Sequence, residues 1–397
     1  MDEGRILNME GLPIPCQRGA FSLPKGLHYL NCAYMSPLPK VVEKAGMAGI
    51  LRKRNPSALS ADDFFQESDE ARRLFSLLVN APDPSSVALL PSVSYGVGVA
   101  ARNTSVSPGQ NLVLLQEQFP GNVYAWRRLA REARAEVRTV EPGPGKGRGR
   151  RWNDRILEAI DKDTAVVAMA PVHWTDGTLF DLDAIGARSR EVGAALIIDG
   201  TQSVGALPFD VESLKPDALI VAGYKWLLGP YSIGLGYYGS RYREGVPLEE
   251  TWIAREGSED FQALVDYRDE YQPGAVRFDV GERSNFILVP MLVAALRLVL
   301  HWEPARIQGY VKALTRELFT EVAEMGYVLE DEAFRAGHIF GLRLPQGLDA
   351  DLLRAALQEE RVSASLRGSA LRISPHMFND SGDLEALLRS LRAALRA

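Results

Sequence analysis

The sequence predicts an α/β protein in which a large, mostly parallel sheet with crossover helices is joined to a smaller α+β domain. Two observations carry this prediction. Between residues 86 and 238, short apolar runs alternate with amphipathic stretches, a pattern typical of strands buried on both faces and separated by helices. After about residue 285, long helical segments replace this alternation. We therefore expect a large domain over 20–285, and a small domain over 286–397 that also takes in 1–19.

The elements of the large domain follow from where the hydrophobic period changes. Strands are predicted at 86–92, 111–116, 135–140, 164–171, 194–199, 218–222 and 233–238, and helices at 94–103, 123–133, 153–161 and 181–192. Gly193 ends the last of these helices, as a C-terminal glycine does. Ligands of such sheets bind beyond the carboxyl ends of the strands. Chemistry is therefore expected in the loops that follow Leu90, Leu115, Met169, Ile198 and Val221.

The small domain is predicted from a helical region over 290–325, which Pro304 should break or bend. It continues with strands at 338–344 and 370–374 and helices at 350–360 and 384–396. One segment of the chain is compositionally biased, the glycine-rich basic stretch PGPGKGRGRR at 142–151. It lacks the Ser/Thr and the spacing of a phosphate-binding P-loop, so a solvated loop is expected there.

Composition excludes several classes of protein. The chain has 45 Lys and Arg against 51 Asp and Glu, a net charge of −6, which argues against nucleic-acid and anionic-membrane partners. Its cysteines, Cys16 and Cys32, cannot build a disulfide framework or a multi-cysteine zinc site, and no metal centre is predicted. The first residues, MDEGRILNMEGLPIP, are not a secretory signal, and no run has the length of a membrane span. A cytoplasmic enzyme is the expectation.

An ionisable residue stands at or just past the carboxyl end of each of two neighbouring predicted strands. Asp199 ends one strand, and Lys225 lies in the otherwise apolar, glycine or aromatic run LIVAGYKWLLG. A lysine in such surroundings is desolvated, which lowers the pKa of its amine and makes it a nucleophile toward a carbonyl. Pyridoxal phosphate (PLP) chemistry needs these two groups, a lysine to hold the aldehyde and a carboxylate to keep the pyridine nitrogen protonated. A turn-forming Asp and a solvated Lys are the structural alternatives.

The same block resembles a known family. DGTQSVG at 199–205 and GYKWLLGP at 223–230 resemble the D-G-x-Q-S-x-G and G-[HY]-K-x-x-x-G-P motifs of the class V aminotransferase family of fold-type I PLP-dependent enzymes. That family includes cysteine desulfurases, isopenicillin-epimerase-like proteins and kynureninase relatives. The resemblance runs from about Tyr29 to the end of the chain. It implies the fold-type I architecture, PLP (pyridoxal 5'-phosphate) as cofactor, and a homodimer.

The resemblance also implies roles around the cofactor. Lys225 would form the Schiff base, Asp199 would pair with the pyridinium, and Gln202 would donate a hydrogen bond to the phenolic oxygen. The expected phosphate contacts are the Ser94 hydroxyl, the Tyr95 amide, and further hydroxyls of Ser203 and Tyr224, the last in place of the histidine that many members carry. A serine at this helix start could instead be an N-cap, and the two roles are compatible because phosphate binds at helix N-termini.

Two further positions concern the faces and the edge of the cofactor ring. Phe119 occupies the family position that stacks on the ring, where desulfurases have a histidine, so proton transfer should fall mainly to Lys225. Core packing is the alternative for Phe119. His173, in PVHWTDGT, is the candidate near the phenolic oxygen and a candidate catalytic residue, although Trp174 could take that register. A structural histidine is the alternative there.

The resemblance places the remaining contacts at the two ends of the chain. Ser284 and Asn285, in GAVRFDVGERSNF, would reach across the dimer interface toward the partner's phosphate. Arg372 would clamp the substrate carboxylate, with Arg367 the next candidate, and Asn31 in YLNCAYMSP would border the substrate site. Surface arginines and a turn-forming asparagine are the structural alternatives.

These inferences predict a PLP enzyme that acts on an amino acid through Schiff-base exchange at Lys225, with aminotransfer favoured. A C–S lyase or an amino-acid epimerase on the same scaffold is the alternative. A desulfurase is discounted because the chain has no cysteine after Cys32, which reads as a small buried residue. A nucleotide-dependent enzyme is disfavoured because YGVGVA at 95–100 is not followed by the required acidic residue. The non-enzymatic alternative is a PLP-fold binding or sensor protein.

Overall fold

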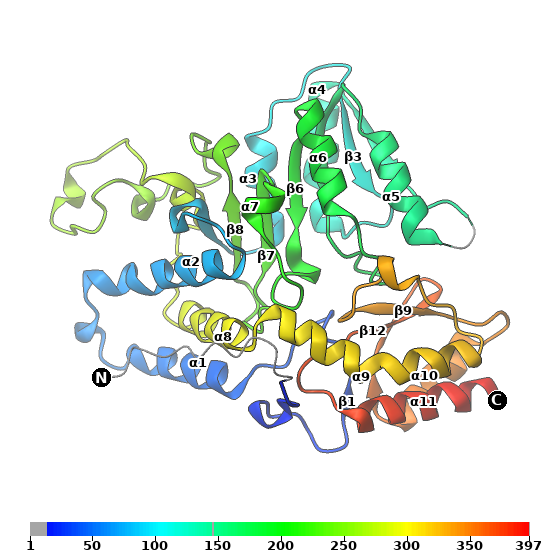
Figure 1. Cartoon of the computed structure of the whole chain (residues 1–397). Coiled ribbons are helices and arrows are strands. Elements are labelled where there is room, and N and C mark those ends of the chain that lie inside the picture. Colours follow the sequence, from blue (N-terminus) through cyan, green and yellow to red (C-terminus); the bar gives the residue numbers. More distant parts are fainter. Residues whose placement is uncertain (1–13, 145–146, 397) are drawn as a thin grey trace.

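The centre of the molecule is a seven-stranded sheet in the order β2-β8-β7-β6-β5-β3-β4, seen in a computed structural model that describes residues 14–144 and 147–396 (Figure 1). β8 is antiparallel to both of its neighbours, and the other pairs are parallel. The predicted α/β fold with a mostly parallel sheet is confirmed. The strands are β2 (Val87–Leu90), β3 (Asn111–Leu115), β4 (Glu136–Val140), β5 (Thr164–Met169), β6 (Ala195–Asp199), β7 (Ala218–Ala222) and β8 (Gly234–Tyr238).

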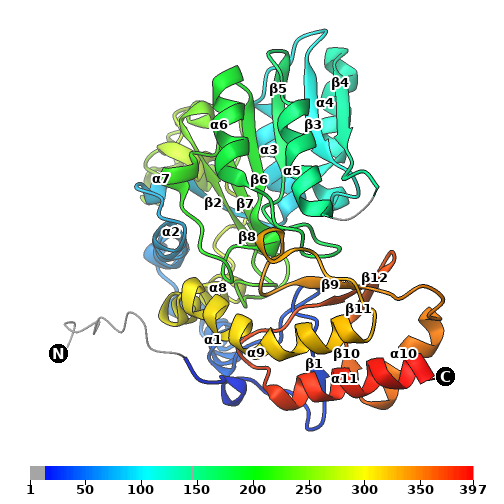
Figure 2. The same ribbon diagram turned by 45° about the vertical axis from the view of Figure 1, so that its right-hand side comes forward.

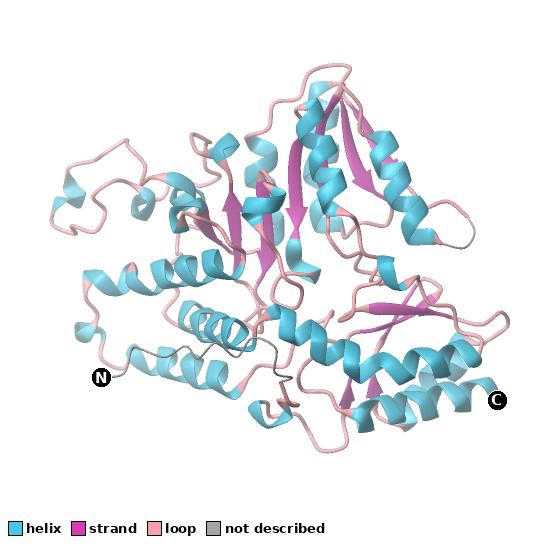
Figure 3. Ribbon diagram, in the orientation of Figure 1, coloured by secondary structure: helices cyan, strands magenta, loops and turns pink. Residues whose placement is uncertain are grey.

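Apolar residues cover both faces of this sheet, because successive side chains of a strand point in opposite directions. In β3, Val113 and Leu115 belong to one buried cluster, and Leu112 and Leu114 belong to the other. The first cluster includes residues of α2 (Gln66–Leu78), α5 (Arg148–Ala159), α6 (Leu182–Val192), α7 (Val211–Leu214) and α8 (Leu288–Trp302). The second includes residues of α3 (Val93–Arg102) and α4 (Tyr124–Ala133). Figure 3 shows the resulting helix–sheet–helix layers.

The expected loop at 142–151 is wrong in its second half, because α5 already begins at Arg148. Gly147, in the left-handed conformation at φ 65°, turns the chain into the helix. The guanidinium carbon of Arg148 then lies 4.2 Å from the centre of the Trp152 ring, one turn further along. This cation–π contact stabilises the first turns of the helix, whereas the glycine-rich composition of the segment predicted a loop.

Two helices near the N-terminus, α1 (Lys40–Arg52) and α2, were not predicted, and both pack against α8. The predicted break at Pro304 is present. α8 ends at Trp302, α9 (Pro304–Glu324) begins at the proline itself, and the two helices meet at 66°. Proline suits the first position of a helix because its missing N–H would have no partner there.

A smaller α+β part lies beyond the carboxyl ends of the large sheet (Figures 1 and 2). Its three-stranded antiparallel sheet has the order β11-β12-β9, and α9, α10 and α11 contribute to its core. The N-terminal segment joins it, because β1 pairs with β10 in parallel. The elements are β1 (His28–Tyr29), β9 (Phe340–Arg343), α10 (Ala350–Glu359), β10 (Val362–Ser363), β11 (Ser365–Arg367), β12 (Ala370–Ile373) and α11 (Ser381–Arg396).

The domain boundary at residue 285 stays a prediction, and residues 1–13 of the segment assigned to the small domain lie outside the described residues. Over the described ranges, no single helix is long and apolar enough to cross a membrane. The bent pair α8 and α9 passes that length and composition test only when the two helices are joined.

Candidate active site

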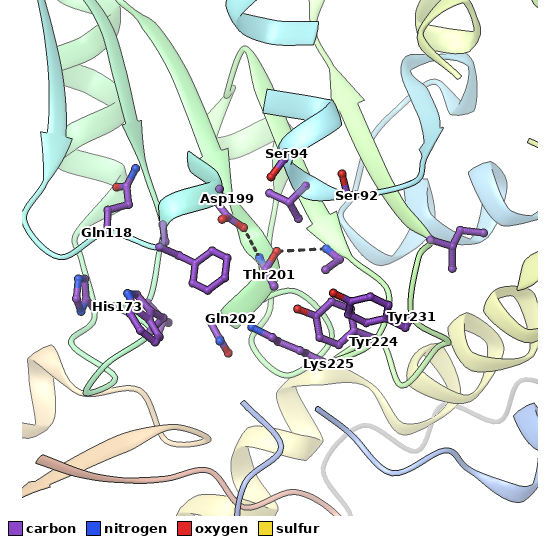
Figure 4. A pocket seen from close by; sticks show the side chains of 18 of the residues that line it. Ser92, Ser94, Gln118, His173, Asp199, Thr201, Gln202, Tyr224, Lys225 and Tyr231 are labelled. Atoms are coloured by element: carbon purple, nitrogen blue, oxygen red, sulfur yellow. Dashed lines mark hydrogen bonds between the residues drawn. The ribbon is translucent and has the colours of Figure 1, made fainter. Parts of the chain in front are cut away.

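The loops after the carboxyl ends of β2, β3, β5, β6 and β7 enclose a cavity of about 290 Å³ (Figure 4). This is where the parallel-sheet rule placed the chemistry. Four side chains of the predicted site that line it, Asp199, Gln202, Tyr224 and Lys225, come from the two recognised motifs. The other lining residues are Pro91, Ser92, Val93, Ser94, Leu115, Gln118, Phe119, Gly121, Ala170, Val172, His173, Trp174, Thr201, Ala222, Tyr231, Ser232 and Ile233.

Lys225 lies in the turn that follows β7, with its side chain in the cavity. The residue is 6% exposed, and its Nζ lies 5.5 Å from the ring centres of both Phe119 and Tyr224. Burial lowers the pKa of the Lys225 amine to about 8, against the opposing effect of Asp199 and with a further lowering from Arg372. A larger fraction of this amine is therefore unprotonated near neutral pH than of an ordinary lysine, as a nucleophile toward an aldehyde requires.

Asp199 is the last residue of β6, and its carboxylate is buried. Its Oδ1 accepts a hydrogen bond from the Thr201 backbone N–H at 3.1 Å, and the Thr201 hydroxyl accepts one from the Ala222 N–H at 3.2 Å, which ties β6 to β7 (Figure 4). Burial raises the pKa of Asp199, while the Thr201 hydrogen bonds and Lys225 lower it. Within the described ranges Asp199 makes no ion pair, so this buried carboxylate in the cavity wall is suited to a cationic N–H from a ligand.

Gln202 and Ser203 follow in the 3-10 turn after β6. The Gln202 amide donates to the Ala33 carbonyl at 3.0 Å and accepts from the Trp226 indole at 2.9 Å, so it links both motifs and the N-terminal segment. Gln202 also lines the cavity. Ser203 is fully buried, donates to the Gly200 carbonyl at 3.1 Å, and is not among the residues that line the cavity.

Hydroxyl groups gather at the start of α3, the predicted phosphate end. The N-cap is Ser92, whose hydroxyl accepts a hydrogen bond from the Tyr95 N–H at 3.1 Å, so the capping role considered for Ser94 belongs to Ser92. Ser94 is free of that role and lines the cavity. The predicted Tyr95 amide contact therefore competes with an existing cap. Tyr224 lines the cavity with its ring 4.6 Å from that of Tyr231.

Phe119 and Trp174 form an aromatic wall on one side of the cavity. Their rings meet edge to face, with centres 5.5 Å apart and planes at 85°. Phe119 is 43% exposed, so it does not serve as core packing. His173 is nearly fully buried, with its two ring nitrogens 2.7 Å from the Thr175 hydroxyl and 3.2 Å from the Gln116 carbonyl. Burial lowers its pKa to about 4, which keeps the ring neutral at neutral pH.

Arg372 and Asn31 lie together on the side of the site that the small domain supplies. The Arg372 guanidinium donates to the Trp174 carbonyl at 2.7 Å and lies 3.5 Å from the Asn31 side-chain oxygen. That oxygen also accepts from the Ser365 hydroxyl at 2.9 Å. Arg372 lines a cavity of about 290 Å³ together with Lys225, Phe119 and Trp174, so it faces the same space as Lys225.

Ser284 and Asn285 lie away from this cavity in the described chain. The Ser284 hydroxyl donates to the Phe64 carbonyl, and the Asn285 side chain accepts from the N–H groups of Ile287 and Leu288 at 3.1 and 2.9 Å, capping α8. Both line a separate cavity of about 480 Å³ that includes no other predicted site residue. Their role at a partner's phosphate stays a prediction.

Sequence reasoning missed several residues of the cavity. Thr201 is the variable position of the D-G-x-Q-S motif, and its hydroxyl joins two strands of the site. Tyr231 and Ser232 follow the second motif and line the wall beside Tyr224. Ser232 has a left-handed backbone at φ 65°, which is unusual for a residue other than glycine. Tyr231 and Ser232 could have been predicted as site residues because they directly follow the GYKWLLGP motif.

The donor set fits PLP. An aldehyde needs an amine of lowered pKa, which Lys225 supplies. A pyridinium N–H needs an unpaired carboxylate, which Asp199 supplies, and a phosphate needs hydroxyls at a helix start, which Ser92 and Ser94 supply. The flat ring needs an apolar cover, which Phe119 supplies.

Comparison with known proteins identifies what this chain resembles. The sequence profile of the family described as aminotransferase class-V matches residues 51–387. An uncharacterised aminotransferase, YcbU, of Bacillus subtilis is 25% identical over 329 residues, which cover 83% of this chain and 84% of that protein. Isopenicillin N epimerase of Streptomyces clavuligerus is 25% identical over 340 residues, covering 82% and 83% respectively.

Solved structures share the fold. The cysteine desulfurase CsdA of Escherichia coli superposes with a TM-score of 0.78 at 18% identity, over 96% of this chain and 97% of that one. The cystine C–S lyase C-DES also superposes with a TM-score of 0.78 at 18% identity, over 92% and 97%. At these identities the likeness supports the architecture and leaves the reaction open.

Proposed function

Because the chain belongs to the aminotransferase class-V family, and is therefore a PLP-dependent enzyme of transferase or lyase type, we propose that it acts on an α-amino acid with Lys225 as the catalytic amine and transfers the amino group. Bound PLP supplies an electron sink that stabilises negative charge developing at the substrate Cα. The observation that carries the proposal is the position of Lys225, which lines both the cavity of Asp199 and that of Arg372.

The residues divide the work of binding in this proposal. Asp199 holds the proton of the pyridine nitrogen, Ser92 and Ser94 with the first turn of α3 bind the phosphate, and Phe119 covers the ring. Arg372 binds the substrate carboxylate with its planar guanidinium, which Asn31 helps to orient through the 3.5 Å contact. Phe119 and Trp174 form an apolar wall that excludes water from the amine.

The titratable groups favour one base over two. Burial lowers the pKa of Lys225 to about 8, so this amine can accept a proton near neutral pH. His173 is held neutral with a pKa of about 4, and burial raises the pKa of Tyr224 to about 12. Cys32 is fully buried, and burial raises the pKa of its thiol, so it does not supply a thiolate. A single base at Lys225 suits aminotransfer, in which one group removes and returns the proton, better than epimerisation by two bases on opposite faces.

We infer in addition that the enzyme is a homodimer. The cavity that Ser284 and Asn285 line also includes three aromatic side chains, Phe64, Trp252 and Phe286, and Trp252 is 41% exposed. Aromatic residues with a partly exposed face are typical of interfaces. Light scattering of the PLP-loaded protein should give twice the mass of the chain. A monomer that binds PLP tightly would contradict this part of the proposal.

One assay distinguishes the candidate reactions. The PLP-loaded enzyme is mixed with single amino acids, with and without a 2-oxo acid acceptor, in deuterated water. Aminotransfer predicts new 2-oxo acid and new amino acid in equal amounts, and only when the acceptor is present. Pyruvate and ammonia, formed with sulfide from cysteine or with cysteine persulfide from cystine, would indicate a C–S lyase. Deuterium at Cα with inversion, and no 2-oxo acid, would indicate an epimerase.

A further inference from the structure

Two arginines point from the same face of the hairpin that β11 and β12 form. In its antiparallel register Ser365 pairs with Arg372, and Arg367 pairs with Ala370. Directly paired residues share a face, and so do alternate residues of one strand. Arg367 and Arg372 are therefore diagonal neighbours on one face, an arrangement that like charges disfavour.

Neither arginine has an acidic partner in the part of the chain that the structure describes. The polar contacts of Arg372 are the Trp174 carbonyl and the Asn31 amide oxygen, and Arg367 donates to the Leu366 carbonyl at 3.0 Å. The Nε atoms of both arginines are buried without a hydrogen-bond partner. The guanidinium of Arg367 lies 5.7 Å from the Trp174 ring centre, a cation–π contact that does not neutralise its charge.

Two neighbouring arginines, unlike Arg367 and Arg372, form ion pairs with a carboxylate. Arg148 and Arg343 both pair with Asp176, at 3.2 and 2.8 Å. These two arginines line a cavity of about 500 Å³ with Arg367 on its wall. Of the three, Arg367 is the one that makes no ion pair with a carboxylate of the described residues; Glu117 also lines this cavity, but no ion pair joins it to Arg367.

The uncompensated pair faces the substrate side of Lys225. Arg367 and Arg372 both line the 290 Å³ cavity that also includes Lys225, and neither lines the cavity of Ser92 and Ser94. The cofactor phosphate therefore does not account for them. Burial, followed by the charge of Arg367, lowers the pKa of Arg372 to about 10. One carboxylate would neutralise one arginine and leave the other unpaired, whereas two anionic groups on one ligand would neutralise both.

We propose that this enzyme is selective for amino acids whose side chain ends in an anionic group, with Arg372 binding the α-carboxylate and Arg367 the side-chain anion. That the ligand is a substrate rests on the proposed function. Binding of two carboxylates by Arg367 and Arg372 does not depend on it. Arg367 is thus a specificity-determining residue. Its position in both cavities leaves room beyond it for side chains of different length.

Equilibrium binding tests this without turnover. Succinate and butyrate have the same number of carbon atoms and differ by one carboxylate, and both are titrated into the PLP-loaded enzyme by calorimetry. A charged hydrogen-bonded contact contributes about 10- to 150-fold in affinity, so succinate should bind at least about tenfold more tightly than butyrate. Arg367→Gln should abolish that ratio. Arg354→Gln, which changes an exposed arginine on α10, should preserve it.

The outcomes separate this proposal from the proposed function. Equal affinities for succinate and butyrate in the unaltered enzyme, or a succinate preference that survives Arg367→Gln, would overturn it. A succinate preference in an enzyme that turns over no amino acid would leave the dicarboxylate site standing and refute the proposed function. If amino acids are turned over, aspartate or glutamate should exceed asparagine or glutamine in kcat/KM by a similar factor, and the reverse order would count against Arg367.

Discussion

The two halves of the site differ in the charged groups that they bury. The cofactor half, made of Ser92, Ser94, Asp199 and Lys225, contains a buried carboxylate with no ion pair among the described residues. The substrate half, made of Asn31, Arg367 and Arg372, contains two guanidinium groups that make no ion pair with the described residues. A folded chain leaves buried charges unpaired at a cost. The difference indicates what each half binds, a cationic ring nitrogen in one and anionic groups in the other.

In the cofactor half, Lys225→Ala should have the largest effect on activity. It removes both the amine that binds the aldehyde and the proposed catalytic base, so kcat should fall by about 10⁴-fold or more. Lys162→Ala, which changes a lysine that is 87% exposed, is the matched control and should retain full activity. Residual turnover in Lys225→Ala within tenfold of the parent would show that the base lies elsewhere.

The substrate half is tested by Arg372→Lys. A point charge cannot reproduce the planar fork that binds a carboxylate at two points. Loss of such a contact costs about 2–5 kcal/mol, so kcat/KM for amino acids should fall by about 30- to 4,000-fold. Cofactor content, read from the bound PLP absorbance, should stay at one per chain because Arg372 does not line the cofactor cavity. Unchanged amino-acid kinetics would move the carboxylate contact to Arg367.

The lowered pKa of Lys225 predicts a pH dependence of cofactor loading. The unprotonated amine reacts, and its fraction rises as the pH passes through about 8 rather than through the 10.5 of an ordinary lysine. The rate at which apoprotein takes up PLP should therefore rise about tenfold from pH 7 and level off above pH 9. Stopped-flow absorbance follows this step. A rate still rising steeply at pH 10 would mean that the amine is not desolvated.

The smallest expected effect concerns the aromatic wall between the two halves. Phe119→Leu removes the edge-to-face contact with Trp174 and the flat cover for the cofactor ring. An aromatic pair contributes about 0.5–1.5 kcal/mol, so the variant should bind PLP about two- to tenfold more weakly than the parent. Fluorescence titration of apoprotein measures it. A change above a hundredfold would indicate that Phe119 does more than cover the ring.

The cofactor half could be predicted from the sequence because each of its motifs is contiguous and ends a strand. DGTQSVG begins at the last residue of β6 and GYKWLLGP follows β7. The hydrophobic pattern predicts both strands, and ligands of parallel sheets bind beyond such strand ends. Thr201 was not predicted as a site residue, because the D-G-x-Q-S motif leaves its position variable. The N-cap also shifted from Ser94 to Ser92, since sequence pattern places helix starts to within a residue or two.

The substrate half could not be predicted in the same way. Asn31 meets Ser365 across 334 residues of chain and Arg372 across 341, and no period or local motif relates such segments. The family resemblance indicated Arg372, but it could not show that Arg367 shares its face without an acid nearby. That depends on the register of β11 and β12, which a two-residue turn at Gly368 and Ser369 determines.

Covalent attachment of PLP to Lys225 underlies every role proposed above, and chemical trapping of the Schiff base tests it. The PLP-loaded protein is reduced with borohydride and digested, and the pyridoxyl-labelled peptide is identified by mass spectrometry. We expect one label per chain, on Lys225 within GYKWLLGP. A label on another lysine, or a fully loaded protein that carries no label, would contradict it.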